Sequence, residues 1–432
     1  MESSREERVE GCKHWILSEK GSKAVLIRNV TVVDCTGREP QPNMDVEVLE
    51  GKIARVASTG SLSSGVSVDA AGLTLMPGLT DAHVHLALVH AGGGHGSDPW
   101  VDHVLHVKDI IEGTLQEGFT TVRDAGGLEP AFAHAVERGK IRGPRILPSG
   151  SVLSQTGGHG DLRAHHEAVA PGVSIPGLVA RPEVVDGVAE VKRAAREQLR
   201  RGARQIKLMT SGGVLSPTDP FDSIQFTVDE IAAAVEVART WGTYVLAHCH
   251  TSPAINNALD GGAHSIEHSS MVDEATAERM AREGAFAVIT LQVMEELMDD
   301  PTLAGLTESQ ISKLQAVGSQ KRTSIDCLQA AGVKLGSGSD LVGPDQKNRG
   351  REIVLMGELI GAHQAIISAT RTNAELFRMD DRIGTIEEGK YADLILVDGN
   401  PVDDITVLGQ PEKIRAVVRG GEVCKDIEGR FA

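Results

Sequence analysis

The feature that most constrains the fold is the placement of polar side chains directly after short apolar runs, at widely separated positions. Each run has the length of a buried strand, and each ends in a histidine, lysine or aspartate. In a parallel barrel the carboxyl ends of all strands meet at one mouth. The sequence therefore predicts a barrel whose mouth collects His83, His85, Lys207, His248, His268 and Asp340.

The central part of the chain alternates strand-like and helix-like segments. One helix is expected at 227–240, where Thr227 and Glu230 have the spacing of a capping box and apolar residues recur at helical spacing. This alternation is typical of an α/β protein with a (β/α)8 TIM barrel, to which we assign residues 76–384. The expected strands are 73–80, 119–124, 145–150, 204–209, 243–248, 264–267, 285–290 and 333–338.

Both ends of the chain contain further strand-like segments. Residues 24–34 and 45–57 alternate in polarity and are rich in β-branched residues, and 392–397 and 414–418 repeat the pattern near the other end. Strands at both ends around a central α/β block indicate one composite domain. We expect a small β-sandwich domain built from 24–75 and 385–432, preceded by an N-terminal extension at 1–23.

The composition excludes several classes of partner. A net charge of −17 over 432 residues argues against nucleic acid or an anionic membrane surface. No apolar run reaches the roughly 18–20 residues that a membrane span needs. The five cysteines are scattered and form no CxxC pair, and the first residues contain no apolar signal segment. We expect a reduced, cytoplasmic protein.

The histidines have the spacing and chemistry of metal ligands. His83 and His85 are two residues apart on a strand end, so both side chains face the same side. A lone HxH pair, a lone histidine or a lone aspartate after glycines is an ordinary strand-end or turn feature. Together with His248, His268 and Asp340 on other strands, the set predicts a site for zinc or a similar divalent ion.

Lys207 is the unusual member because a lysine inside an apolar strand must lose its charge or find a partner. A neutral amine in a metal-lined cavity can take up carbon dioxide and become a carbamate, which offers two oxygens like a carboxylate. Such a group could bridge two metal ions about 3.5–4 Å apart. The alternative is a lysine whose ammonium reaches solvent at a strand edge.

These motifs resemble the amidohydrolase superfamily over nearly the whole chain. MPGLTDAHVH, the strand lysine, HCH, IEH and GSGSD follow in its order, and IGTIEEGKYADLILVDGNP is similar to its returning β segment. TTVRDAGG, SQTGGHGD and IKLMTSGGVLSP resemble the Xaa-Pro dipeptidase-like branch and its ochratoxinase-type amidases. The resemblance implies that His83 and His85 bind one ion, that His248 and His268 bind the other, and that carbamylated Lys207 bridges them.

The resemblance also implies roles for three further groups. Asp340 would bind metal and carry the proton from water to the leaving amine. His250 stands where many peptidases of this branch have tyrosine, as in ochratoxinase-like enzymes, and could donate a hydrogen bond to the substrate carbonyl. His159, in a glycine-rich loop, could reach the substrate or merely lie in a tight turn. No arginine or lysine is singled out for a substrate carboxylate.

The predicted activity is therefore hydrolysis of the amide bond in N-acyl amino acids or dipeptides, with ochratoxin A as a specific test substrate. A cyclic-amide or lactone hydrolase on the same scaffold is the alternative. Deaminases of this superfamily generally use one metal and lack the bridging lysine, so Lys207 argues against them. A non-catalytic barrel is the remote alternative. The resemblance also implies a homo-oligomer, with an octamer as one such assembly.

Overall fold

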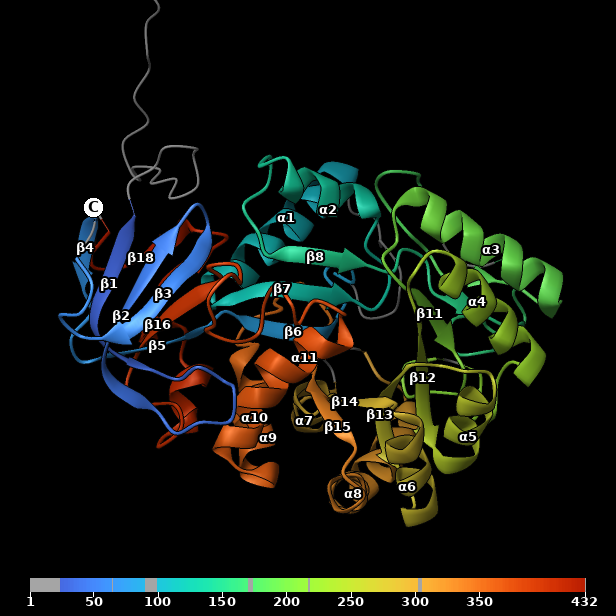
Figure 1. The fold of residues 1–432 in the computed structure, drawn as a ribbon. Coiled ribbons are helices and arrows are strands. Elements are labelled where there is room, and N and C mark those ends of the chain that lie inside the picture. The colour runs from blue at the N-terminus through green and yellow to red at the C-terminus, as the bar shows by residue number, and fades with distance from the viewer. Residues whose placement is uncertain are drawn as a thin grey trace, which may run out of the picture.

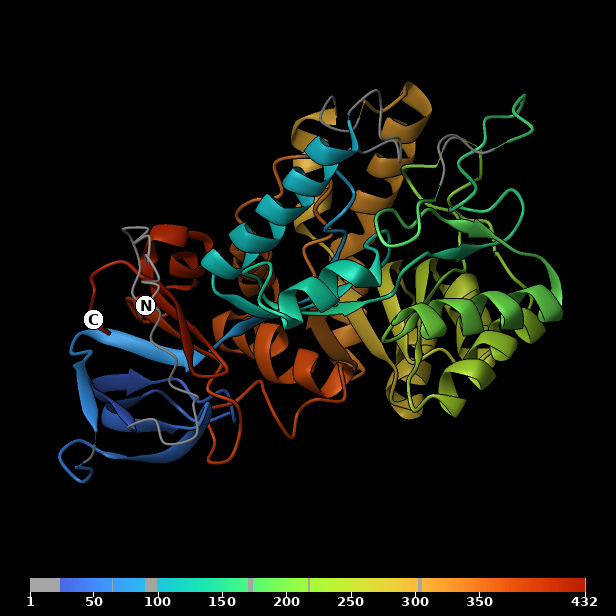
Figure 2. The same cartoon turned by 90° about the horizontal axis from the view of Figure 1, so that it is seen from above.

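The computed structural model describes residues 24–63, 65–89, 99–169, 174–216, 218–301 and 305–431. The expected extension at 1–23 lies outside these residues. The described chain forms a mixed α/β fold in which a sheet built from both chain ends lies beside a larger α/β region (Figures 1 and 2). Among the described residues, no helix combines the length and the apolar character that crossing a membrane requires.

The sheet made from both ends interleaves early and late strands. Its hydrogen-bonded order is β18-β17-β16-β5-β1-β2-β3, with β4 paired to β1. The late strand β16 runs antiparallel to both β5 and β17 (Figure 1, red beside blue). The strands are β1 Val25–Val32, β2 Gln41–Leu49, β3 Lys52–Ser58, β4 Val66–Asp69, β5 Leu73–Pro77, β16 Leu394–Asp398, β17 Ile414–Arg419 and β18 Glu422–Asp426.

The central strands are parallel and form two arcs. One arc has the order β6-β7-β8 and the other β10-β9-β11-β12-β13-β14-β15. Their bounds are β6 Leu79–Val84, β7 Phe119–Asp124, β8 Arg145–Pro148, β9 Leu153–Ser154, β10 Glu183–Val184, β11 Ile206–Met209, β12 Val245–Thr251, β13 Ser265–Met271, β14 Phe286–Ile289 and β15 Lys334–Ser337.

Single backbone hydrogen bonds, not strand ladders, join the two arcs in the described chain. The Asp340 N–H donates to the His83 carbonyl at 2.8 Å beyond β15 and β6, and the Arg204 N–H donates to the Pro148 carbonyl at 2.7 Å beside β8 and β11. Two local features interrupt the ladder at the second seam. Pro148 has no N–H to donate, and β9 pairs with β11 at Leu208.

The single strand expected at 73–80 is wrong. Leu73–Pro77 forms β5 in the sheet built from both ends, whereas Leu79–Val84 forms β6 in the first arc. Gly78 lies between them, and a Cβ there would lie 2.2 Å from Thr120 Oγ1. The apolar run continues through both strands because both are buried, so hydrophobicity alone could not reveal the boundary.

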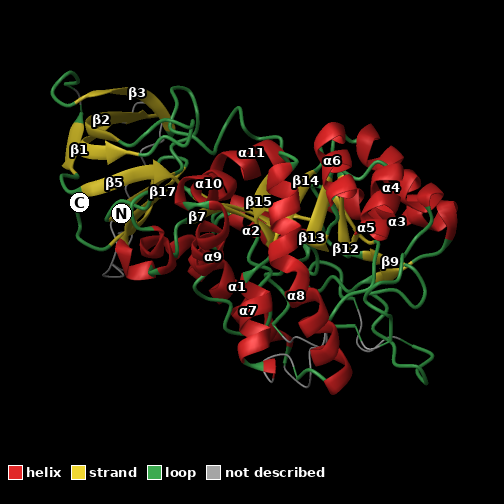
Figure 3. Ribbon diagram, turned by 90° about the horizontal axis from the view of Figure 1, so that it is seen from below, coloured by secondary structure: helices red, strands yellow, loops and turns green. Residues whose placement is uncertain are grey.

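Helices enclose the arcs, as the red helices around the yellow strands show in Figure 3. The expected helix at 227–240 is observed as α4, and its Thr227–Glu230 capping box is formed. The helices are α1 Trp100–Gln116, α2 Pro130–Glu137, α3 Gly187–Arg201, α4 Val228–Thr240, α5 Ser252–Asp260, α6 Glu274–Glu283, α7 Gln292–Asp299, α8 Glu308–Ala330, α9 Gly350–Ile360, α10 Ala362–Ile367 and α11 Asn373–Leu376. Shorter turns are η2 Ser368–Thr372, η3 Ile405–Gly409 and η4 Pro411–Lys413.

Candidate active site

A cavity of about 370 Å³ opens at the carboxyl ends of the central strands. All the side chains predicted for the site line this one cavity, although they are distributed over more than 250 positions of the sequence. They are His83, His85, His159, Lys207, His248, His250, His268 and Asp340. The topology therefore places the predicted residues together, as expected for residues at the ends of parallel strands.

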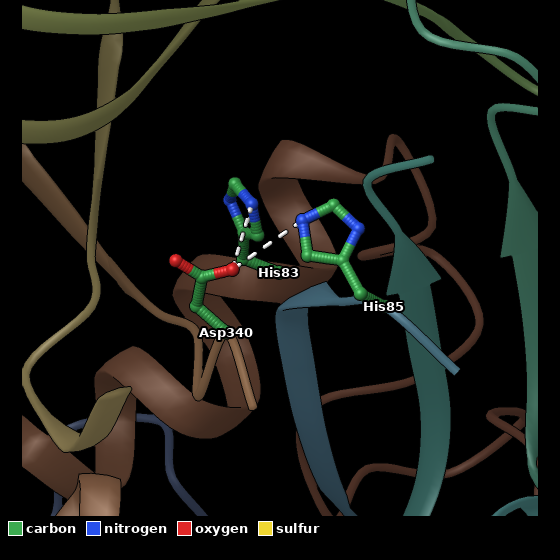
Figure 4. A group of neighbouring side chains, drawn as sticks. All are labelled: His83, His85 and Asp340. Carbon is green, nitrogen blue, oxygen red and sulfur yellow. Dashed lines mark ion pairs between the residues drawn. The ribbon is translucent and has the colours of Figure 1, made fainter. Parts of the chain in front are cut away.

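His83, His85 and Asp340 form the tightest group of possible ligands. One ligand atom from each lies within 4.8 Å of the others. Both rings point toward the same Asp340 oxygen, with His83 Nε2 at 3.5 Å and His85 Nε2 at 3.3 Å from Oδ1 (Figure 4). His83 comes from β6, His85 follows that strand directly, and Asp340 follows β15.

The hydrogen bonds of the His83 and His85 rings leave one nitrogen of each ring available to bind a cation. His83 Nδ1 lies 2.7 Å from Glu267 Oε2, and His85 Nδ1 lies 2.7 Å from the Gly126 carbonyl oxygen. Those oxygens can only accept, so each Nδ1 carries the hydrogen, and in the neutral form of each ring Nε2 presents a lone pair toward Asp340. His83 Nε2 is buried and has no hydrogen-bond partner. Two lone pairs facing a carboxylate fit a positive ion, so the donor set fits a divalent metal.

Asp81 connects the two strand ends that carry this group. Its carboxylate accepts hydrogen bonds from the His83 N–H at 3.0 Å, the Ser339 N–H at 3.1 Å and the Ser339 hydroxyl at 2.5 Å. Asp340 itself has a left-handed φ of 54°, a conformation that costs free energy in a non-glycine residue. A Cβ at Gly338 would lie 2.6 Å from His83 Cβ. Close approach and shared hydrogen bonds thus hold Asp340 against His83.

A fully buried ion pair between Arg123 and Glu267 holds the His83 ring in its orientation. Arg123 Nη2 donates to both Glu267 oxygens, at 2.8 and 2.9 Å, and the Ser265 hydroxyl donates to Glu267 Oε1 at 2.5 Å. Burial opposes ionisation of Glu267, but the positive charge of Arg123 and the hydrogen bond from His83 outweigh it and hold its pKa at about 2. Glu267 is therefore a carboxylate that orients the His83 ring.

Breaking this ion pair should destabilise the protein strongly. Arg123→Met leaves the buried Glu267 carboxylate without its main partner, so we expect the free energy of unfolding to fall by about 3–5 kcal/mol. Urea denaturation monitored by circular dichroism measures the free energy of unfolding of each variant. Arg322→Met is the matched control, because Arg322 pairs with Asp326 at 3.1 Å and both side chains are more than half exposed, so its effect should be much smaller. Equal losses in both variants would contradict the structural role of Arg123.

His248, His268 and Lys207 form the other side of the site. The His248 and His268 ring centroids are 4.5 Å apart, and His268 Nδ1 lies 3.7 Å from Asp340 Oδ2. Burial lowers the pKa of both imidazoles well below the usual value, which keeps them in the neutral, metal-binding form. Burial also lowers the pKa of Lys207 to about 8, so a fraction of its amine is neutral near pH 7.

The backbone at His268 is strained and is held by a distant lysine. His268 and Ser269 have φ values of 71° and 47° in the middle of β13. Lys321, from the middle of α8, donates a 2.6 Å hydrogen bond to the His268 carbonyl. A charged donor at this carbonyl favours the strained backbone over a regular strand conformation. Lys321 therefore fixes the direction in which His268 enters the cavity.

His159 and His250 line the cavity next to the predicted ligands His248 and His268. His159 stacks on His248 with a centroid distance of 4.4 Å, and its Nδ1 lies 2.8 Å from the Ser216 hydroxyl. His250 stacks on His268 at 5.1 Å, and its Nδ1 lies 3.1 Å from the Ser270 hydroxyl. Burial lowers the pKa of His159 to about 4 and that of His250 to about 3. Both are neutral near pH 7 and can act as hydrogen-bond donors without carrying a charge.

Gly213 shows why the glycine-rich segment after Lys207 is needed. A Cβ at this position would lie 2.3–2.6 Å from atoms of the His159 ring. Only a glycine lets the ring pack directly over the backbone. The loop at 156–161 is thus more than a tight turn, because it carries His159 into the cavity beside His248.

Sequence reasoning did not assign roles to Arg123, Glu267, Asp81 or Lys321. Arg123 and Glu267 were visible as charged residues inside apolar strands, which is a signal of buried pairing, and both lie in motifs of the family resemblance. Lys321 gave no such signal, because it lies in a helix of mixed polarity.

The apolar wall of the cavity was also not predicted. It comprises Val293, Met294, Leu297, Leu306 and Leu314.

Comparison with known proteins agrees with this geometry. The sequence profile of the amidohydrolase family matches residues 74–424. Ochratoxinase from Aspergillus niger is 33% identical over 372 residues, which cover 81% of this chain and 75% of that protein. A prolidase solved in complex with N-methylphosphonate-L-proline is 37% identical, with a TM-score of 0.88 and coverage of 93% of this chain and 100% of that chain.

A Xaa-Pro dipeptidase with methionine bound in its active site is also similar. It is 30% identical, has a TM-score of 0.82 and covers 93% of this chain and 99% of that chain. The family profile and the ochratoxinase relative each span most of the chain, which confirms the resemblance that the sequence motifs predicted. The chain therefore belongs to the amidohydrolase family and is similar to its prolidase and ochratoxinase members.

Proposed function

We propose that this protein is a two-metal amidohydrolase that cleaves the amide bond of N-acyl amino acids or dipeptides. The family membership makes it a hydrolase of amide or peptide bonds. The observation that carries the finer proposal is the single cavity that His83, His85, His248, His268 and Asp340 line together with the buried Lys207. Neutral imidazoles and a carboxylate are ligands for zinc, the expected metal.

We assign the candidate ligands to two groups, with Lys207 as the proposed bridge between them. His83 and His85 would hold one ion, His248 and His268 would hold the other, and Asp340 is near enough to both groups to contribute to either. A carbamate on Lys207 would supply two oxygens between them. When bound, such ions make water nucleophilic near neutral pH and polarise a carbonyl group.

The chain's own groups can complete the reaction. The Asp340 carboxylate can accept the proton released when water adds to the amide carbon, and return it to the nitrogen as the C–N bond breaks. His250, neutral and directed into the cavity, can donate a hydrogen bond to the carbonyl oxygen as it gains charge. Such a donor contributes on the order of 3 kcal/mol in other hydrolases. His159, stacked on His248, is placed to contact the substrate.

The scaffold proposed for this site is a (β/α)8 barrel in which the two arcs act as one unit. The hydrogen bonds at Asp340 and Arg204 hold the arcs together. Beside it, residues 24–75 and 385–432 would form the composite β-sandwich domain. A homo-oligomer, with an octamer as one possible assembly, stays a prediction that light scattering on the purified protein can test.

The substrate class rests on the relatives and on the cavity wall. The relatives are named ochratoxinase, prolidase and Xaa-Pro dipeptidase. The apolar wall formed by Val293, Met294 and Leu297 suits an aromatic or aliphatic group beside the reacting amide. We therefore propose N-acyl amino acids and dipeptides with a free carboxylate as substrates, and ochratoxin A, split to ochratoxin alpha and phenylalanine, as one of them.

The test is an incubation of the zinc-loaded protein with ochratoxin A, N-acyl-phenylalanines and Xaa-Pro dipeptides. We expect mass spectrometry to detect the free amino acid as a second product. The matched control is N-acyl-phenylalaninamide, which lacks the carboxylate and should react more slowly. If all these compounds remain intact while a cyclic amide or lactone is opened to one product, the alternative hydrolase should replace this proposal.

A further inference from the structure

A buried arginine contacts the chain segments that carry the ligand group drawn in Figure 4. Arg349 directly precedes α9, and its side chain has no exposed surface. Its guanidinium donates three hydrogen bonds of 3.0 Å each, from Nε to Thr114 Oγ1, from Nη1 to Ser339 Oγ and from Nη2 to Gln346 Oε1. A planar donor of fixed geometry therefore joins three segments of the chain.

The first branch of this network reaches Asp340 through its neighbour Ser339. The Ser339 hydroxyl accepts from Arg349 and donates to Asp81 Oδ2 at 2.5 Å. Asp81 also accepts hydrogen bonds from the N–H groups of His83 and Ser339. Arg349 Nη1 lies 3.8 Å from the same Asp81 oxygen, so the attraction of opposite charges reinforces the arrangement. Arg349 thus restrains the residue directly before Asp340 and the carboxylate that holds the His83 backbone.

The second branch reaches His85 through the side-chain amide of Gln346. A guanidinium can only donate, so the Gln346 atom that faces Arg349 is the oxygen. The amide nitrogen then faces the other way, where it donates to the His85 carbonyl at 2.9 Å and to the Leu88 carbonyl at 3.5 Å. Without Arg349 the amide could turn and bring its own oxygen against the His85 carbonyl. Arg349 thereby fixes the hydrogen bond that holds the backbone of His85.

The backbone of Arg349 is itself anchored on two sides. Glu117, directly after α1, accepts hydrogen bonds from the Asn348 and Arg349 N–H groups at 2.9 Å each. Gly350 lies so close to Leu408 that an added Cβ would be 1.8 Å from the Leu408 carbonyl oxygen. The guanidinium therefore starts from a backbone position that α1 and the C-terminal part of the chain determine.

The side-chain contacts of Arg349 are confined to one side of the site. In the part of the chain that the structure describes, β15 and β6 share no strand ladder, so Arg349 adds to the single Asp340 N–H bond at this seam. None of the three side-chain hydrogen bonds reaches His248 or His268. The His268 carbonyl is held instead by a different buried cation, Lys321. Loss of Arg349 should therefore disturb one ligand group more than the other.

We propose that Arg349 is a positioning residue that strengthens binding of the ion assigned to His83 and His85. This inference rests on the two-metal function proposed above. The guanidinium acts through Ser339 and Gln346, which it orients, rather than on the metal ligands themselves. Removing a group that orients metal ligands typically weakens metal binding about 10–100-fold. That effect should fall on one ion of the two.

Zinc titration of the metal-free protein against a competing chelator measures the affinity for each ion. Arg349→Lys keeps the positive charge, but one ammonium cannot reproduce the fork that holds Ser339 and Gln346 together. We expect one of the two ions to bind about 10–100-fold more weakly. Gln346→Leu removes only the branch to the His85 carbonyl, keeps Arg349, and should weaken the same ion.

The matched control is Arg200→Lys. Arg200 is exposed and pairs with Glu197 on α3, so this variant should bind both zinc ions as the wild type does. Thermal denaturation of each metal-free variant verifies that it is folded. Anomalous diffraction at the zinc edge, on crystals grown at limiting zinc, identifies the weakened ion. Arg349→Lys should lose most of the peak beside His83 and His85 and keep the peak beside His248.

The outcomes separate this inference from the proposed function. If the wild type binds two zinc ions, and Arg349→Lys and Gln346→Leu bind both as tightly as the control, the positioning role is wrong and the two-metal function stands. Equal weakening of both ions would indicate a general structural role and would also overturn the inference. A wild-type protein that binds no zinc would overturn the two-metal function together with it.

Discussion

Asp340→Asn should reduce the turnover number by roughly three orders of magnitude or more, because the amide can neither accept the proton from water nor return it to the leaving nitrogen. The Asp340 carboxylate oxygens lie 3.3–3.7 Å from nitrogens of His83, His85 and His268. An asparagine has the same shape, so folding should be preserved. Steady-state kinetics measures the turnover number, and circular dichroism on the same preparation verifies that the variant is folded.

The matched control for this variant is Asp345→Asn. Asp345 lies five residues further along the chain, and its side chain is 83% exposed. This substitution removes the same charge without touching the cavity, and activity should be unchanged. A near-normal rate for Asp340→Asn at neutral pH would show that another group carries the proton, and the role proposed for Asp340 would be wrong.

Lys207→Ala should lose most of its bound metal and almost all of its activity. The proposed carbamate would bridge the His83–His85 group and the His248–His268 group, so its loss removes a ligand from both ions. We expect elemental analysis to find about two divalent ions per wild-type chain and far fewer in the variant. Lys347→Ala, at an exposed position, should retain wild-type metal content.

A second readout separates carbamylation from a simple packing defect. Wild-type protein prepared with ¹³C-bicarbonate should show a carbamate carbon resonance that disappears in Lys207→Ala. Small carboxylic acids such as propionate should partly restore metal binding to the variant by filling the space of the carbamate. Full metal content and full rate in Lys207→Ala, or a labelled resonance that persists, would contradict the bridging role.

The fold was predictable to the extent that it depends on local alternation. The helix 227–240 followed from its capping box and its apolar spacing, and the central strands followed from short apolar runs. The division at Gly78 was not predictable, because β5 and β6 are both buried and form one continuous apolar run. Which sheet a buried strand joins depends on partners such as Leu394–Asp398, far away in sequence.

The site was predictable where a residue is defined by its own chemistry and position in a strand. His83, His85, His248, His268 and Asp340 follow apolar runs and have side chains that bind metal. The supporting residues act through contacts that only the folded chain creates. Lys321 reaches the His268 carbonyl from a helix 53 residues further along the chain, and Arg123 pairs with Glu267 across 144 residues. No local sequence pattern predicts such long-range contacts.

The pairing of β5 with β16 has a consequence for how the protein is made. About 300 residues separate the two strands, and synthesis at 5–20 residues per second takes roughly 15–60 s to cover that distance. During that time the edge of β5 that β16 later occupies is open in the nascent chain. Open strand edges pair with other chains. Yield on overexpression should therefore depend on chaperones that act at the ribosome, more than it depends on the stability of the finished enzyme.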